Sequence, residues 1–234
     1  HDRFQARATQ PITLSREIDE TLGMPETGIH GDALTIRYRF PDGFEYVMAL
    51  VVGGAAGNGA VGNGASLQAP IVMPDQVHAT IALPDRYTGP VYTLYLTVVT
   101  SREAADPLAA ALANLERAKA EGYQAHRERQ TRWWAAFWER SGIQLQDRFL
   151  ESLWYFSLYQ LASTCRGDVA PGLFGLWNMT KSPQWHGDYH GDYNISMAHW
   201  FLFSSNHLEL GEPYFRTVLR LLPMAQAQTR EMYQ

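Results

Sequence analysis

The first hundred residues alternate apolar and polar positions with the period of two expected for half-buried β-strands. The clearest run is Leu-Thr-Ile-Arg-Tyr-Arg-Phe at 34–40, and further runs rich in β-branched and aromatic residues lie at 45–52, 77–83 and 91–99. The Pro-Asp-Gly sequence at 41–43 is a turn signal between the first two runs. We therefore expect an antiparallel sheet that forms part of a β-sandwich.

After these strands the apolar residues recur at helical spacing. Asp106 followed by Pro107 is a good helix start, because proline is favoured at the first helical position. The pattern predicts a helix that runs toward Arg140 with a break near Gly122. The segment contains an aromatic cluster, Trp-Trp-Ala-Ala-Phe-Trp at 133–138, which we interpret as packing between two domains in preference to a platform for sugars.

A third region, beginning at Asp147, is helical in pattern. Asp147 suits the N-cap of a helix, residues 195–207 have the pattern of a second helix, and Pro213 opens a third, which Pro223 should kink or interrupt. The organisation is therefore multidomain, β then α. We expect a partial β-sandwich domain at 1–105, a helical linker at 106–144 and the N-terminal part of an all-helical domain at 145–234.

The composition argues against several classes of protein. With 46% hydrophobic and 18% charged residues among 234, the chain has an ordinary globular composition and not a disordered one. A formal net charge of −5 argues against a nucleic acid partner and gives no attraction to anionic lipid. No apolar run approaches the roughly 20 residues that span a bilayer. The single cysteine, Cys165, excludes an internal disulfide, and we interpret it as a small core residue.

The segment Trp-His-Gly-Asp-Tyr-His-Gly-Asp-Tyr-Asn at 185–194 carries the densest polar chemistry of the chain. Carboxylates and amides bind hydroxyl groups, and aromatic rings offer flat apolar faces to sugar rings. Most of the segment lies in a long irregular loop, 166–191, and loops of that length inside compact domains are usually functional. We interpret it as the floor of a carbohydrate site. Trp177 and Trp185 are candidate stacking surfaces, with closure of the helical core as the alternative for each.

We expect neither a metal nor an organic cofactor. His186, Asp188, His190 and Asp192 alternate, so on an extended backbone all four side chains would point to one side. Imidazole and carboxylate ligate zinc or manganese, yet same-face residues on a strand lie roughly 6.5–7 Å apart, too far to converge on one ion. Substrate hydroxyl binding explains them better, with a structural polar network as the alternative. The Gly-x-Gly-x-x-Gly match at 57–62 lacks the helix that follows a dinucleotide-binding loop, so we expect a surface loop.

Three segments resemble the linker and first catalytic helices of glycoside hydrolase family 95: the aromatic cluster at 133–138, the run Pro-Gly-Leu-Phe-Gly-Leu-Trp-Asn at 171–178, and residues 185–200. These six-hairpin glycosidases have an N-terminal β-sandwich, a helical linker and an (α/α)6 barrel. The resemblance implies a partial antiparallel β-sandwich followed by a helical linker and the first helices of an (α/α)6 toroid. It also implies that the general acid lies beyond residue 234.

The characterised members that the chain resembles are inverting α-L-fucosidases and α-L-galactosidases, in which an Asn-x-Asn pair helps to hold the attacking water. That pair falls on Asp192 and Asn194, so the first position is Asp in this chain. Helix capping is the alternative role for the same two residues. The resemblance makes both of them catalytic and implies a sugar subsite lined by Trp177, Asn178, Trp185, His186, Asp188 and His190.

We therefore expect a fragment of an inverting glycoside hydrolase that acts on an oligosaccharide or polysaccharide, and the resemblance implies a periplasmic or extracellular protein. One alternative is a polysaccharide lyase or phosphorylase on a related helical toroid, for which Tyr189 and His190 would be a candidate catalytic pair. The other is a non-catalytic glycan-binding protein that keeps the fold without turnover. Residues 195–200 depart from the fucosidase pattern, so the sugar is left open.

Overall fold

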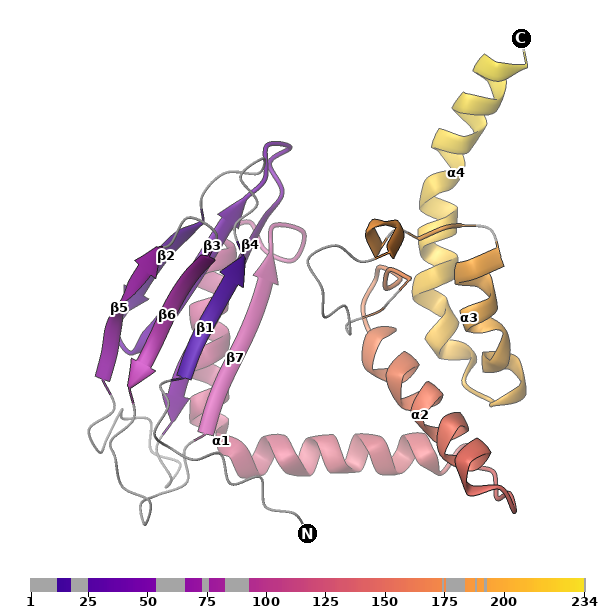
Figure 1. Cartoon of the computed structure of the whole chain (residues 1–234), viewed down its shortest axis with the longest axis horizontal. Helices are drawn as coiled ribbons and strands as arrows, with labels where there is room; N and C mark the ends of the chain where they lie inside the picture. Colours follow the sequence, from indigo (N-terminus) through magenta and orange to yellow (C-terminus); the bar gives the residue numbers. More distant parts are fainter. Residues whose placement is uncertain are drawn as a thin grey trace. The chain divides into compact units, whose positions relative to one another are not determined.

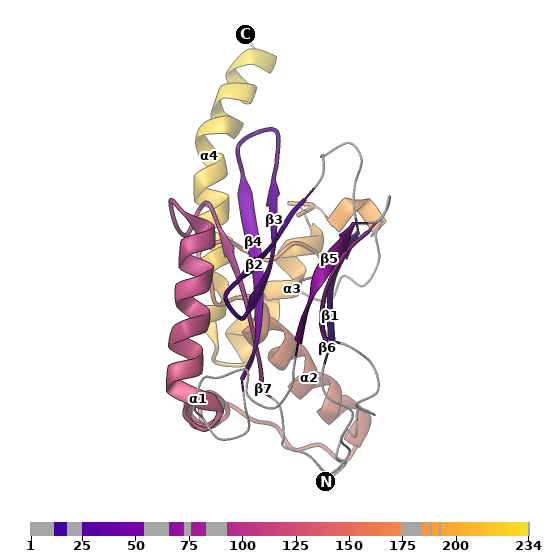
Figure 2. The same cartoon turned by 90° about the vertical axis from the view of Figure 1, so that its left-hand side faces the viewer.

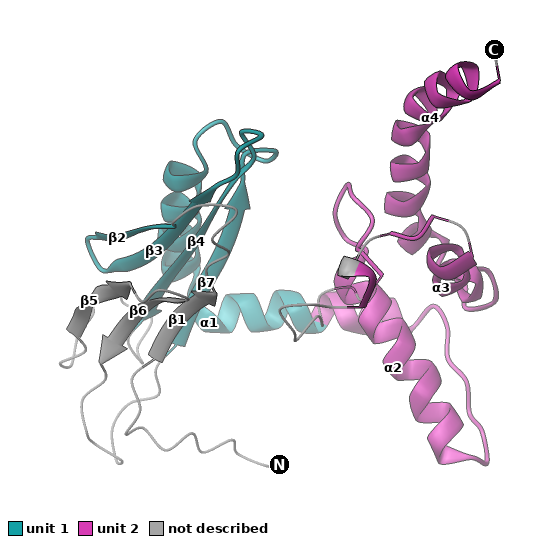
Figure 3. Cartoon of the chain, turned by 45° about the horizontal axis from the view of Figure 1, so that its top comes forward, with its two compact units in different colours: residues 1–131 teal, residues 132–234 magenta. Residues whose placement is uncertain are grey.

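The computed structural model describes residues 12–17, 25–53, 66–72, 76–82, 93–173, 175, 184–187, 189–191 and 193–233. The chain forms two compact units, unit 1 at residues 1–131 and unit 2 at residues 132–234 (Figure 3). The predicted β then α order is confirmed, because all the described strands precede the helices. The three-part division with a linker at 106–144 stays a prediction.

Unit 1 contains two antiparallel sheets, with the strand orders β2-β3-β4-β7 and β1-β6-β5 (Figure 1; Figure 2). Strands β5 and β6 contact β2 and β3. Each of the four predicted runs corresponds to a strand, whereas the sequence pattern does not predict β1, β2 or β5. The strands are β1 Ile12–Glu17, β2 Glu26–His30, β3 Ala33–Arg39, β4 Glu45–Gly53, β5 Ser66–Val72, β6 Gln76–Ala82 and β7 Thr93–Thr100.

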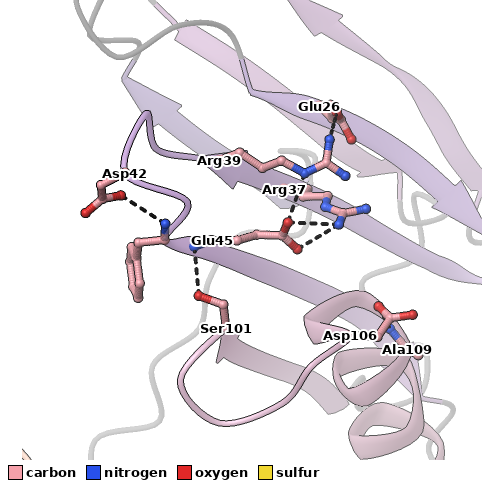
Figure 4. Close-up of polar contacts among 9 residues, drawn as sticks. Glu26, Arg37, Arg39, Asp42, Glu45, Ser101, Asp106 and Ala109 are labelled. Atoms are coloured by element: carbon pink, nitrogen blue, oxygen red, sulfur yellow. Dashed lines mark hydrogen bonds and ion pairs between the residues drawn. The ribbon is translucent and has the colours of Figure 1, made fainter.

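The predicted turn joins β3 to β4. Gly43 has a φ of 86°, a left-handed conformation that favours glycine, and its N–H donates to the Phe40 carbonyl at 3.0 Å. The Asp42 carboxylate accepts the N–H of Phe44 at 2.9 Å, as Asp commonly does in turns (Figure 4). This turn sets the register of the hairpin, in which Arg39 pairs with Glu45.

Glu45 binds two arginines beside this turn (Figure 4). Its side chain is only 11% exposed, and its two oxygens lie 2.8 and 2.9 Å from one guanidinium nitrogen of Arg37. Arg39 Nε donates to the same carboxylate at 2.9 Å and extends the network to Glu26 on β2 at 2.8 Å. The Arg37 hydrogen bond is the main cause that lowers the pKa of Glu45. The network therefore ties three strands together through a charged carboxylate.

Helix α1, Pro107–Trp138, begins and breaks where the sequence predicts. The Asp106 carboxylate accepts the N–H of Ala109 at 3.0 Å. Gly122 has φ 75° and ψ 160°, values outside the helical region, and the two parts of α1 run in different directions (Figure 1). The part before the break packs on the four-stranded sheet, opposite the three-stranded sheet (Figure 2). The buried residues of this core are Ala33, Val47, Ala49, Val51, Val99, Ala111 and Leu115.

Unit 2 is helical and contains α2 Arg148–Thr164, α3 Tyr193–Ser204 and α4 Glu212–Met232, with short 3-10 helices η1 Gln184–Gly187 and η2 Leu208–Gly211. Asp147 is the N-cap of α2, as predicted, and accepts the N–H groups of Phe149 and Leu150 at 2.9 and 3.2 Å. Helix α4 continues through Pro223 to Met232, so the helix is not interrupted there, and the alternative of a kink stays a prediction. Pro223 has no N–H to donate, and a surface helix can leave the matching carbonyl to water.

The aromatic cluster at 133–138 packs into the core of unit 2, and its predicted role in packing between two domains stays a prediction. Phe137 is 5% exposed, and the three tryptophans of the cluster pack against the same core. His207 is fully buried and stacks on Phe137, with ring centroids 3.9 Å apart. Cys165 is 4% exposed, as its prediction as a core residue requires, and burial raises the pKa of its thiol.

Candidate active site

The start of the predicted site loop is fixed to α4. Ala170 is 3% exposed, and its N–H donates to Thr217 Oγ1 at 3.1 Å, while the Thr217 hydroxyl donates to the Pro213 carbonyl at 2.8 Å. Asp168 forms an ion pair with Arg216 at 2.8 Å, but both side chains are at least half exposed, so that pair contributes little. The buried Ala170–Thr217 hydrogen bond is therefore the main polar attachment of this end of the loop.

The far end of the loop returns to the same point. The Tyr189 hydroxyl donates a short hydrogen bond to the Ala170 carbonyl, so Ala170 holds α4 through its N–H and residue 189 through its C=O. His190 follows with a φ of 42°, an uncommon conformation for a residue with a side chain. This closure fixes the backbone immediately before the two predicted catalytic positions, 192 and 194.

Trp185 and His190 are brought together, as the prediction of a shared sugar subsite requires. Their ring centroids lie 5.3 Å apart in an edge-to-face arrangement, and Trp185 is 55% exposed. The Nε2 atom of His190 is buried and has no hydrogen-bond partner among the described residues. Trp185 does not close the core, so its ring offers an accessible apolar surface.

Asn194 lies inside the first turn of α3, which begins at Tyr193. The capping interpretation therefore does not apply to Asn194, because an N-cap precedes the first helical residue. Beside it, the rings of Tyr193 and Trp200 meet edge to face at 5.5 Å. Asn194 is partly buried at this end of α3, directly after the closed loop.

Several predicted site residues lie outside the described residues: Trp177, Asn178, Asp188, Asp192 and the side chain of His186. The backbone of His186 lies in the 3-10 helix η1, so this residue is not on the extended backbone on which the four alternating side chains would share one side. Among the described residues, no three His, Cys, Asp or Glu side chains are grouped so that they could hold a metal ion.

A cavity of about 300 Å³, which the sequence did not predict, lies between α2, residues 171–173 with Gly175, and α3. We call it the α2–α3 pocket, and its walls include Gln160, Thr164 and His199. Gln160 and Thr164 are four residues apart on one helix, a spacing that places them on the same face. The sequence therefore indicates that these two residues share a helix face, but only the packing of α2 against α3 shows that this face lines a cavity.

None of the helices in the described part of the chain is both long and apolar enough to cross a membrane.

Comparison with known proteins connects these features to one family. The family model described as the glycosyl hydrolase family 95 catalytic domain matches residues 113–234, which is more than half of the chain and includes all the predicted site residues. The chain is also similar to "Probable alpha-fucosidase A" of Aspergillus niger (strain ATCC MYA-4892 / CBS 513.88 / FGSC A1513), with 34% identity over 88 residues. That match covers 37% of this chain and 11% of the relative, so it spans about a tenth of the relative's length. The chain belongs to glycosyl hydrolase family 95.

Proposed function

We propose that this protein is an inverting glycoside hydrolase acting on oligosaccharides or polysaccharides, with α-L-fucosides and α-L-galactosides as the first substrates to test. The match of the family 95 catalytic domain over residues 113–234 carries the proposal. The similarity to a protein named as an alpha-fucosidase supports the choice of sugar. We further propose a periplasmic or extracellular location, which rests on the family resemblance and is tested by cell fractionation.

Inverting hydrolysis needs an acid and a base on opposite faces of the sugar, roughly 6.5–9.5 Å apart, with room for a water. We assign the base side to Asp192 and Asn194, which would orient the attacking water. The fixed backbone at Tyr189 and the helical start at Tyr193 support this role, because catalytic groups need rigid supports.

The sugar subsite would lie beside this pair. The exposed Trp185 ring would stack on the apolar face of the sugar, and His190, whose ring meets Trp185 edge to face, would line the same subsite. We place the remaining predicted residues in the same subsite: Trp177, Asn178, His186 and Asp188.

The Tyr189 contact bears on the lyase alternative. A lyase would use the Tyr189 phenol and His190 as a proton-transfer pair at a uronic acid. The phenol instead donates to the Ala170 carbonyl and holds the loop closed. This contact favours hydrolysis over elimination.

Proton NMR of the protein with α-L-fucosides and α-L-galactosides tests the proposal. Release of free sugar whose first anomer is β would support an inverting hydrolase. An α anomer appearing first would refute inversion, and an unsaturated product would indicate a lyase. The change Asp192→Ala should lower kcat by about 10²–10⁴-fold with a smaller effect on KM, because water activation belongs to the transition state. Unchanged turnover in that variant would overturn the assignment of Asp192.

A further inference from the structure

The α2–α3 pocket has one polar wall on α2. Ser157, Gln160 and Thr164 line it at spacings of three and four residues, so they lie along one face of the helix. The hydroxyl of Ser157 donates to the Leu153 carbonyl at 2.8 Å, and that of Thr164 donates to main-chain carbonyls at 3.1 Å. With their hydrogens committed, both hydroxyl oxygens retain only acceptor capacity, while the partly buried Gln160 amide can donate and accept.

His199 lines the pocket from α3. The side chain is 5% exposed, and its Nδ1 lies 2.9 Å from the Ile195 carbonyl, which can only accept, so Nδ1 donates this hydrogen bond. Nε2 lies 3.9 Å from the Cys165 thiol, and the ring is stacked on Tyr214 with centroids 4.8 Å apart. These contacts hold the ring in a fixed orientation as part of the pocket wall.

The other described walls are apolar side chains and main chain, including Pro171, Leu173 and Phe201. Neutral acceptors facing apolar surface match a hydroxylated ring, whose O–H groups donate and whose C–H faces are apolar. A volume of about 300 Å³ suits one such ring and not an extended chain. Ile195, which also lines the pocket, directly follows Asn194, so the pocket adjoins the proposed water-binding residues along the chain.

We propose that the α2–α3 pocket is a second sugar subsite, which binds one neutral sugar unit of a longer oligosaccharide through Gln160 and Thr164. The proposal rests on the proposed function, because it supposes a glycan substrate. It adds a recognition role for helix residues outside the 185–194 segment.

Titration calorimetry of the protein with a neutral fucosylated trisaccharide tests this subsite. Replacing Gln160 by Leu should weaken binding by about three- to tenfold, the effect of losing one neutral hydrogen bond. The control is Gln226→Leu, the same substitution on the exposed surface of α4, which should leave the affinity unchanged. Thr164→Val, which keeps the side-chain shape, gives a second variant if Gln160→Leu fails to fold. An oligogalacturonide should bind more weakly than the neutral trisaccharide.

Equal affinity in the Gln160→Leu, Thr164→Val and Gln226→Leu proteins would overturn the subsite, as would preferred binding of the oligogalacturonide. These results are separable from the hydrolase proposal. If fucosides are hydrolysed but trisaccharide affinity does not depend on Gln160 or Thr164, the subsite fails and the hydrolase stands. If no glycoside is cleaved but Gln160→Leu selectively weakens trisaccharide binding, the subsite stands and the hydrolase fails.

Discussion

The hydrogen bond between Ala170 and Thr217 should control the order of the site loop. The change Thr217→Val keeps the shape of the side chain but removes the acceptor of the Ala170 N–H. Ala170 is 3% exposed, so its N–H would be left buried without that partner, at a cost of about 1–3 kcal/mol. The ion pair between Asp168 and Arg216 cannot compensate, because both groups are well solvated.

The hydrogen-exchange rate of the Ala170 amide measures the effect of Thr217→Val directly. If local opening governs exchange, a loss of about 1–3 kcal/mol speeds it by roughly 5- to 150-fold. Because the Ala170 carbonyl also holds Tyr189, kcat/KM on a cleaved glycoside should fall, and misplacement by 1 Å can cost about 10²-fold. Thr217→Ser keeps the hydroxyl and is the matched control. If the Val and Ser variants exchanged the Ala170 amide equally fast, the hydrogen bond would not be the attachment that orders the loop.

Two further predictions concern unit 1. Glu45→Gln should destabilise the sheet by about 1–3 kcal/mol at neutral pH, because it leaves Arg37 without its carboxylate partner. The pKa of Glu45 is lowered in the folded protein, so this stabilisation is present above the unfolded-state pKa and is lost as the pH falls through the folded-state pKa. The urea unfolding curves of the wild type and the variant should therefore converge in acid. Gly122→Ala should lower the stability measured by thermal unfolding by about 1–3 kcal/mol, because the φ of 75° at the bend in α1 strains any residue other than glycine. The control is Gly167→Ala, where an added Cβ meets open space and should have little effect. Equal melting midpoints for the two alanine variants would contradict the strain argument.

The parts of the fold that could be predicted are those with local causes. Pro107 starts α1, Gly122 breaks it and Asp147 caps α2, and each of these residues acts on its own neighbours in the chain. Strand β1 has no such signal, because its stability depends on pairing with β6, where Ile12 lies opposite Ile81. Pairing partners far apart in sequence are set by packing, which a single pattern does not encode.

The candidate site also has features that the sequence predicts and features that depend on packing. The chemistry of the 185–194 segment is visible in its residue types, and the family match includes that segment. The short helix η1 at Gln184–Gly187 was not predictable, because the residue pattern there indicates only an irregular loop. His199 is buried, and it lines a cavity only because α3 packs against α2.

The aspartate at position 192 raises the question of which group removes the proton from water. In the family pattern that the chain resembles, an amide at this position can orient water but cannot accept its proton, whereas a carboxylate can do both. If Asp192 is the base, Asp192→Asn should lower kcat about as much as Asp192→Ala, and the acidic limb of the wild-type kcat profile should report its ionisation. If it only holds the water, Asp192→Asn should keep most of the activity that Asp192→Ala loses. A comparison of the two variants on the same glycoside therefore tests general-base catalysis by Asp192, and an active Asp192→Asn enzyme would refute it.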